Sequence, residues 1–119
     1  MTTVLIVDDS RLARDMVGSV MSSLRPNWTI LSAAGGEEAL GKVDGVIPVV
    51  AIVDYNMPGM DGLTLSARLK DLFPSLTIGI LTANVQDALK KKAEAMGCRF
   101  IPKPITSDKI REFLAAAGQ

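Results

Sequence analysis

The sequence contains no histidine and only one cysteine, Cys98. Without histidine there can be no Ser-His-Asp or Cys-His nucleophile site, no histidine-ligated metal and no phosphohistidine on this chain. A lone cysteine excludes an internal disulfide and agrees with a reducing compartment. Carboxylates, hydroxyls and lysines are therefore the side chains from which a reactive site could be built.

Charge of one sign and long apolar runs are also lacking. The 13 basic and 13 acidic residues balance to zero, so there is no strong positive field to attract nucleic acid or a membrane surface. No stretch reaches the ~20 apolar residues of a membrane span, and the N-terminal segment lacks the basic region of a signal peptide. We expect a cytoplasmic protein that neither enters a membrane nor binds nucleic acid directly.

What the chain does contain is a regular alternation of elements within 119 residues, a length that fits one domain with its own core. Apolar runs predict strands at Thr3–Val7, Trp28–Ala33, Val49–Val53, Thr77–Leu81 and Cys98–Ile101. Amphipathic stretches predict helices at Ser10–Leu24, Glu37–Val43, Leu63–Leu72, Val85–Met96 and Asp108–Ala117. This order predicts a doubly wound α/β fold, in which a parallel sheet is covered by helices on both faces.

Apolar spacing predicts which side of each helix faces the core. In the first helix Leu12, Met16, Val20 and Leu24 recur every four residues, so we expect them to point inward. Leu72 is expected to do the same on the third helix.

Polar side chains follow four of the predicted strands. Asp8 and Asp9 follow the first strand, Asp54 the third and Thr82 the fourth, and Lys103 comes just after the fifth. Ligands of doubly wound folds sit outside the carboxyl ends of the strands, so we expect these five side chains to meet at one edge. A single aspartate after a strand is usually a turn residue; the interpretation depends on their joint appearance.

Three carboxylates at one edge repel each other and need a counter-charge. Mg²⁺ prefers such oxygen ligands together with water and phosphate, and Lys103 could bind a phosphate oxygen. A carboxylate can also act as a nucleophile and form an acyl phosphate. Asp54 suits that role because it stands alone on the central strand, whereas the adjacent Asp8 and Asp9 suit a metal. The pattern predicts phosphoryl transfer with Mg²⁺.

Four motifs in this order strengthen the interpretation: Val7-Asp8-Asp9-Ser10, the segment from Val53 to Gly62, Leu81-Thr82-Ala83 and Lys103-Pro104. Through them the sequence resembles the receiver domain of two-component response regulators, the CheY-like family, from Leu5 to about Leu114. The resemblance implies a flavodoxin-like (βα)5 fold with a parallel five-stranded sheet of order 2-1-3-4-5. It also implies one receiver domain over residues 1–119 without an output domain, and often a cis bond before Pro104.

The resemblance implies roles at the metal site. Asp54 corresponds to the phosphoacceptor and, with Asp9 and the backbone carbonyl of Asn56, to the direct Mg²⁺ ligands. Asp8 corresponds to an acid that helps through a metal-bound water.

Roles in switching are implied in the same way. Thr82 corresponds to the switch hydroxyl, Lys103 to the phosphate-binding lysine and Phe100 to the aromatic that changes rotamer. The donor is expected to be a histidine kinase or a histidine phosphotransfer protein. The signal is expected to reach a protein target through the face formed by the predicted elements 85–96, 98–101 and 108–117. The only chemistry expected is self-catalysed phosphotransfer and autodephosphorylation, not conventional enzyme turnover.

Three alternatives stay open at this point. The chain could be a receiver fragment of a larger multidomain regulator. It could be a Mg²⁺-dependent phosphohydrolase, although such enzymes usually have a second acid two residues after the nucleophile, where this sequence has Asn56. It could also be a binding module with the fold but no phosphorylation.

Overall fold

All ten predicted elements are present in the computed structural model, which describes residues 2–119; Met1 lies outside the described residues. The strands are β1 (Thr3–Val7), β2 (Thr29–Ala33), β3 (Val50–Asp54), β4 (Thr77–Thr82) and β5 (Arg99–Pro102). The helices are α1 (Arg11–Leu24), α2 (Gly36–Lys42), α3 (Gly62–Leu72), α4 (Asp87–Ala95) and α5 (Ser107–Ala116).

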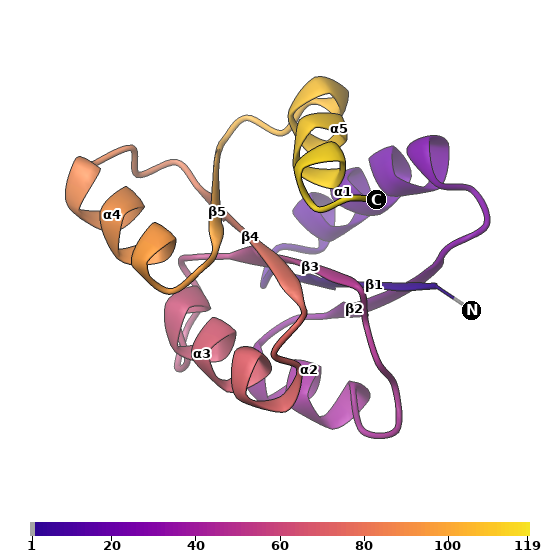
Figure 1. Ribbon diagram of the computed structural model, residues 1–119, viewed down its shortest axis with the longest axis horizontal. Coiled ribbons are helices and arrows are strands. Elements are labelled where there is room, and N and C mark those ends of the chain that lie inside the picture. The colour runs from indigo at the N-terminus through magenta and orange to yellow at the C-terminus, as the bar shows by residue number, and fades with distance from the viewer. Residues whose placement is uncertain (1) are drawn as a thin grey trace.

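The strands form one parallel sheet in the order β2-β1-β3-β4-β5, which confirms the predicted doubly wound α/β fold. Helices α1 and α5 cover one face of the sheet, and α2, α3 and α4 cover the other (Figure 1). Within residues 2–119, no helix has the length and apolar content that crossing a bilayer requires.

The core is divided by the sheet into two clusters, and β1 shows why its sequence is continuously apolar. Leu5 and Val7 belong to the cluster beneath α2, α3 and α4, whereas Val4 and Ile6 belong to the cluster beneath α1 and α5. Alternate side chains of a strand point to opposite faces, so a strand covered on both sides needs apolar residues at every position.

The predicted inward face of α1 is partly wrong. Val17 and Met21 are the buried residues of this helix, whereas Leu12 is 71% exposed and Met16 is 48% exposed. A four-residue step overshoots one helical turn by about 40°, so a row spaced by four drifts out of the core. Leu72, the last residue of α3, was also expected inward and is exposed.

Helix α4 begins two residues later than the predicted Val85, at Asp87, with Gln86 as its N-cap. The chain before it is held by side-chain hydrogen bonds. The backbone amide of Asn84 donates to Thr82 Oγ1 at 2.9 Å, and the backbone amide of Gln86 donates to Asn84 Oδ1 at 3.1 Å. Such local bonds give backbone amides a partner outside a helix, which delays its start.

Candidate functional site

The carboxyl ends of the strands bring the predicted residues to one edge of the sheet. Val7 of β1 pairs in register with Val53 of β3, so Asp8 comes directly beside Asp54. Across the next pair of strands, Thr82 of β4 is in register with Pro102 of β5, immediately before Lys103. The convergence expected from the parallel sheet is therefore present.

The acidic residues form one compact group. Carboxylate oxygens of Asp8, Asp9 and Asp54 all lie within 4.8 Å of one another. Asp8 and Asp54 are only 2% and 4% exposed, whereas Asp9 is exposed. Buried charges of one sign repel strongly at low dielectric, so this group needs positive charge to stay ionised.

Lys103 supplies part of that charge. Its Nζ lies 2.9 Å from Asp54 Oδ1 and 3.9 Å from Asp8 Oδ2, so a single ammonium faces both buried carboxylates. The backbone amide of Lys103 donates to the carbonyl of Thr82 at 2.8 Å, which fixes the start of the side chain beside β4. The ammonium and a phosphoryl group could therefore meet at Asp54.

Asp8 has one satisfied and one unsatisfied oxygen. The Ser10 amide donates to Asp8 Oδ1 at 2.9 Å, but Asp8 Oδ2 is the one buried side-chain oxygen or nitrogen of residues 2–119 that has no hydrogen-bond partner. Buried polar atoms normally have a partner, including water or an ion. A hard cation with oxygen ligands is such a partner, so the residues present fit Mg²⁺.

The pKa values of Asp8, Asp54 and Lys103 are raised, for two reasons. Burial raises the pKa of Asp54 and of Asp8, because it disfavours the charged form. The hydrogen bond from Lys103 acts in the opposite direction on Asp54, but burial outweighs it. Burial would lower the pKa of Lys103, but its hydrogen bond to Asp54 and the nearby carboxylates raise it.

Thr82 is buried at the end of β4, and its hydroxyl oxygen accepts a hydrogen bond from the backbone amide of Asn84. A threonine hydroxyl can donate as well as accept, so this side chain can still bind an anionic oxygen. Asn56 lies exposed in the loop after Asp54. Phe100, by contrast, packs half-buried against the core cluster beneath α2, α3 and α4.

Two supporting residues were missed by the sequence analysis. Arg14 Nη1 donates to the backbone oxygen of Asp8 at 2.7 Å and so braces the turn after β1. A side chain at Gly62 would collide with the carbonyl oxygen of Asp54. The Gly62 amide donates to the backbone carbonyl of Tyr55 at 2.9 Å. Arg14 lies one helical turn after the N-cap of α1, so its position in the sequence could have indicated that it reaches the turn after β1. No local sequence pattern indicates that Gly62 lies close to the backbone of Asp54.

Comparison with known proteins identifies the family to which a site of this geometry belongs. A sequence profile described as the response regulator receiver domain matches residues 4–115. The chemotaxis protein CheY of Listeria monocytogenes is 33% identical over 124 residues, which covers all of both chains. The positive alginate biosynthesis regulatory protein of Pseudomonas aeruginosa is 35% identical, but its match takes in 98% of this chain and only 47% of that protein. The chain thus spans about half the length of the second relative.

Solved structures agree in fold over nearly the whole chain. The chemotaxis protein CheY4 of Vibrio cholerae superimposes with a TM-score of 0.87 at 28% identity, covering 98% of each chain. CheY of Borrelia burgdorferi, solved with CheX, beryllium fluoride and magnesium, gives a TM-score of 0.86 at 25% identity, covering 99% of this chain and 90% of the other.

Proposed function

The chain belongs to the response regulator receiver family of two-component signalling systems, and from that premise we propose that Asp54 accepts a phosphoryl group. One observation carries the proposal: the buried Asp54 carboxylate lies 2.9 Å from the Lys103 ammonium, within a group of three carboxylates. A nucleophile, a phosphate-binding cation and a set of metal ligands are thus present together.

The proposed transfer starts with one carboxylate oxygen of Asp54. This oxygen attacks the phosphorus of a phosphohistidine donor, an Asp54 O–P bond forms, and the donor P–N bond breaks with its electron pair returning to the imidazole. Asp54 then carries an acyl phosphate. In autodephosphorylation water attacks the phosphorus, the O–P bond breaks, and inorganic phosphate and the free carboxylate result.

Mg²⁺ would be held by Asp9, Asp54 and the backbone carbonyl of Asn56, with Asp8 acting through a bound water. When bound, it supplies positive charge that neutralises the carboxylates and the phosphoryl oxygens. Asp8 Oδ2 supports this assignment, because it is buried without a hydrogen-bond partner and such atoms normally bind a protein group, a water or an ion.

Lys103 and Thr82 act on the phosphoryl group itself. The Lys103 ammonium exchanges its contact with Asp54 for a phosphoryl oxygen, so it offsets charge on both reactant and product. The Thr82 hydroxyl donates a hydrogen bond to another phosphoryl oxygen. Movement of Thr82 frees space that Phe100 fills by changing rotamer, which carries the signal to β5.

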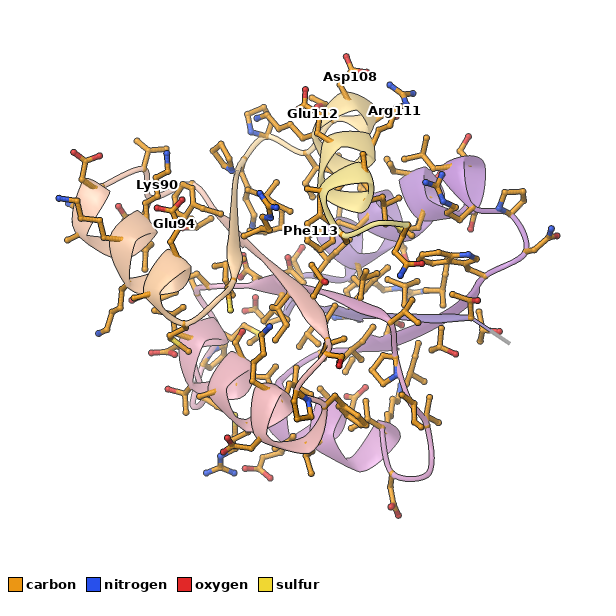
Figure 2. The ribbon with its side chains drawn as sticks, viewed as in Figure 1. Lys90, Glu94, Asp108, Arg111, Glu112 and Phe113 are labelled. Carbon is orange, nitrogen blue, oxygen red and sulfur yellow. The ribbon has the colours of Figure 1, made fainter. Side chains whose placement is uncertain are left out.

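The proposed output surface is the face formed by α4, β5 and α5. Charged side chains of both signs lie on the two helices that flank β5, including Lys90 and Glu94 on α4 and Arg111 and Glu112 on α5 (Figure 2). Phosphorylation would shift the population of conformations of this face, which a target protein reads.

The donor must act in trans, because the chain has no histidine that could be phosphorylated. We propose a histidine kinase or a histidine phosphotransfer protein in the cytoplasm. Residues 1–119 act as one receiver domain whose chemistry is limited to self-phosphorylation and autodephosphorylation. The presence of Asn56 two residues after Asp54 disfavours phosphohydrolase turnover on external esters.

The proposal is tested with acetyl phosphate as a small donor and intact mass as the measurement. Wild-type protein with Mg²⁺ should gain one phosphoryl group, and chelation of Mg²⁺ should prevent it. Asp54→Asn should gain none, whereas Asp71→Asn, a charge-matched change at an exposed position of α3, should behave as wild type. A phosphoryl adduct on Asp54→Asn would refute the assignment.

A further inference from the structure

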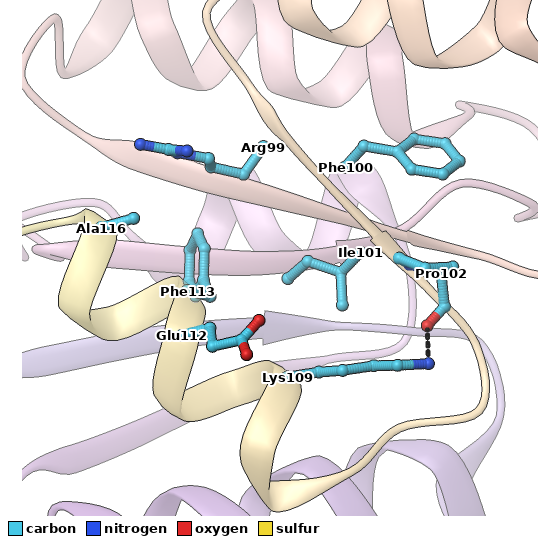
Figure 3. Close-up of a pocket in the computed structure, with 8 residues that line it drawn as sticks. All are labelled: Arg99, Phe100, Ile101, Pro102, Lys109, Glu112, Phe113 and Ala116. Atoms are coloured by element: carbon cyan, nitrogen blue, oxygen red, sulfur yellow. Dashed lines mark hydrogen bonds between the residues drawn. The ribbon is translucent and has the colours of Figure 1, made fainter.

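Lys109, in the first turn of α5, reaches back over the loop that carries Lys103. Its Nζ donates to the carbonyl of Pro102 at 2.9 Å and to the carbonyl of Pro104 at 2.9 Å. Figure 3 shows the first of these bonds, with the stem of Lys109 lying along the pocket between β5 and α5. The two carbonyls flank Lys103 in the chain, so one ammonium holds the backbone on both sides of it.

The position of Lys109 in the first turn of α5 favours binding of its ammonium to these carbonyls. The positive end of the helix dipole lies at the first turn of a helix, where a cation is disfavoured unless other groups bind it. Pro102 and Pro104 have no N–H, so the loop offers few donors of its own for its carbonyls. Lys109 supplies two donors from its ammonium, while its own amide donates to the Thr106 cap at 3.2 Å.

Lys103 needs such support because of its length. A lysine side chain has four rotatable bonds, so the point from which it starts decides how often its ammonium reaches a given acceptor. On one side its backbone is held by the Thr82 carbonyl, at 2.8 Å from the Lys103 amide. The bonds from Lys109 hold the same backbone from the side of α5.

We propose that Lys109 is a positioning residue, which sets the reach of Lys103 into the acidic group and thereby the rate of phosphoryl transfer to Asp54. This inference rests on the proposed function of Asp54. It assigns to α5 a direct mechanical connection to the reacting groups: from the Lys109 ammonium, through two carbonyls, to the Lys103 side chain.

The test compares phosphorylation rates with acetyl phosphate and Mg²⁺. Lys109→Met keeps the apolar stem and removes the donors, and it should react about tenfold more slowly, because small misplacements of a catalytic group have large kinetic effects. Its Mg²⁺ affinity should stay within about twofold of wild type, since Lys109 touches no metal ligand. Lys109→Arg keeps two donors and should recover most of the rate. Lys91→Met, at an exposed position of α4, should match wild type.

A double-mutant cycle separates positioning from a general structural effect. In a Lys103→Met background, Lys109→Met should reduce the remaining rate no further, because the group that it positions is absent. If Lys109→Met alone does not give a folded protein by circular dichroism, Lys109→Gln replaces it and should be slower than Lys109→Arg. A folded Lys109→Met or Lys109→Gln protein that reacts at the wild-type rate, or an undiminished effect without Lys103, overturns the inference. A wild-type protein that takes no phosphoryl group overturns the proposed function instead.

Discussion

The Lys103 ammonium lies 2.9 Å from Asp54 Oδ1, and this ion pair joins the end of β3 to the chain after β5. The carboxylate side chain is 6% exposed and the lysine side chain 32% exposed, so the pair is sheltered on one side only. This pair holds the proposed phosphoacceptor and the proposed phosphate-binding cation side by side.

Removing the ammonium should destabilise the protein at neutral pH. Lys103→Met leaves the buried Asp8 and Asp54 facing each other without that counter-charge, and we expect a loss of about 1–2 kcal/mol in unfolding free energy. This is less than for a fully buried pair because solvent screens the exposed side of the lysine. Urea denaturation at pH 7 without Mg²⁺ measures it. Lys91→Met is the control, and equal stability of the two variants would show that the pair contributes nothing.

The raised pKa values of the buried acids predict how stability depends on pH in Mg²⁺-free buffer. The folded-state pKa of Asp8 and Asp54 lies above the ordinary 3.8, so both groups hold protons more tightly in the folded than in the unfolded protein. Their contribution to stability is fully present below pH 3.8 and is lost as the pH rises through the folded-state pKa values. The pKa of Lys103 is raised above its ordinary 10.5, so its contribution is fully present below pH 10.5, neutral pH included, and is lost as the pH rises through its folded-state pKa.

Neutralising one of these acids should therefore stabilise the protein. Asp54→Asn should have a higher unfolding free energy than wild type at pH 7 without Mg²⁺, and the difference should shrink as the pH falls. Asp71→Asn removes an exposed charge and should show no such pH dependence. Chemical denaturation across pH 4–8 gives both curves. A lower stability of Asp54→Asn at pH 7 would mean that the Lys103 pair outweighs burial.

The close approach of α3 to the end of β3 should make Gly62 intolerant of a side chain. A methyl group there would collide with the Asp54 carbonyl, so we expect Gly62→Ala to lower the unfolding free energy by about 1–3 kcal/mol. Gly18→Ala is the matched control, because its new Cβ on α1 would meet nothing within 4 Å. That change should stabilise by about 0.5–1 kcal/mol. Similar values for the two variants would contradict the packing at Gly62.

Two methionines of α1 test which face of that helix is buried. Met21 is 1% exposed and Met16 is 48% exposed. Met21→Ala should lower the unfolding free energy by about 2–5 kcal/mol, whereas Met16→Ala should change it by less than about 1 kcal/mol. Thermal or urea denaturation of the pair measures the contrast. A larger loss of unfolding free energy for Met16→Ala than for Met21→Ala would show that the face expected from the four-residue spacing is the buried one.

Much of the site could be predicted because a parallel sheet gathers its carboxyl ends at one edge. Asp8, Asp54, Thr82 and Lys103 each end or follow an apolar strand, and strand order alone then makes them neighbours. Their meeting at one edge is confirmed, whereas their individual roles in phosphoryl transfer remain predictions. Local spacing was less informative about which helix residues face the core.

The remaining features depend on tertiary contacts that no sequence window contains. Leu12 and Met16 are exposed because the position of α1 on the sheet decides which part of its apolar surface is covered. The need for glycine at position 62 arises where α3 crosses the end of β3, and the bonds of Lys109 arise where α5 turns back toward β5. Each feature needs the distance between two elements, which propensity and periodicity do not give.

Locating the phosphorylated residue shows directly whether Asp54 is the phosphoacceptor. Protein treated with acetyl phosphate and Mg²⁺ is reduced with sodium borohydride, which converts an aspartyl phosphate to the corresponding alcohol, and the digested peptides are sequenced by mass spectrometry. We predict that the reduced residue is Asp54, that it is absent without Mg²⁺, and that Asp8 and Asp9 remain unmodified. Reduction at Asp8, at Asp9 or at no aspartate in a protein that has gained a phosphoryl group would contradict the account.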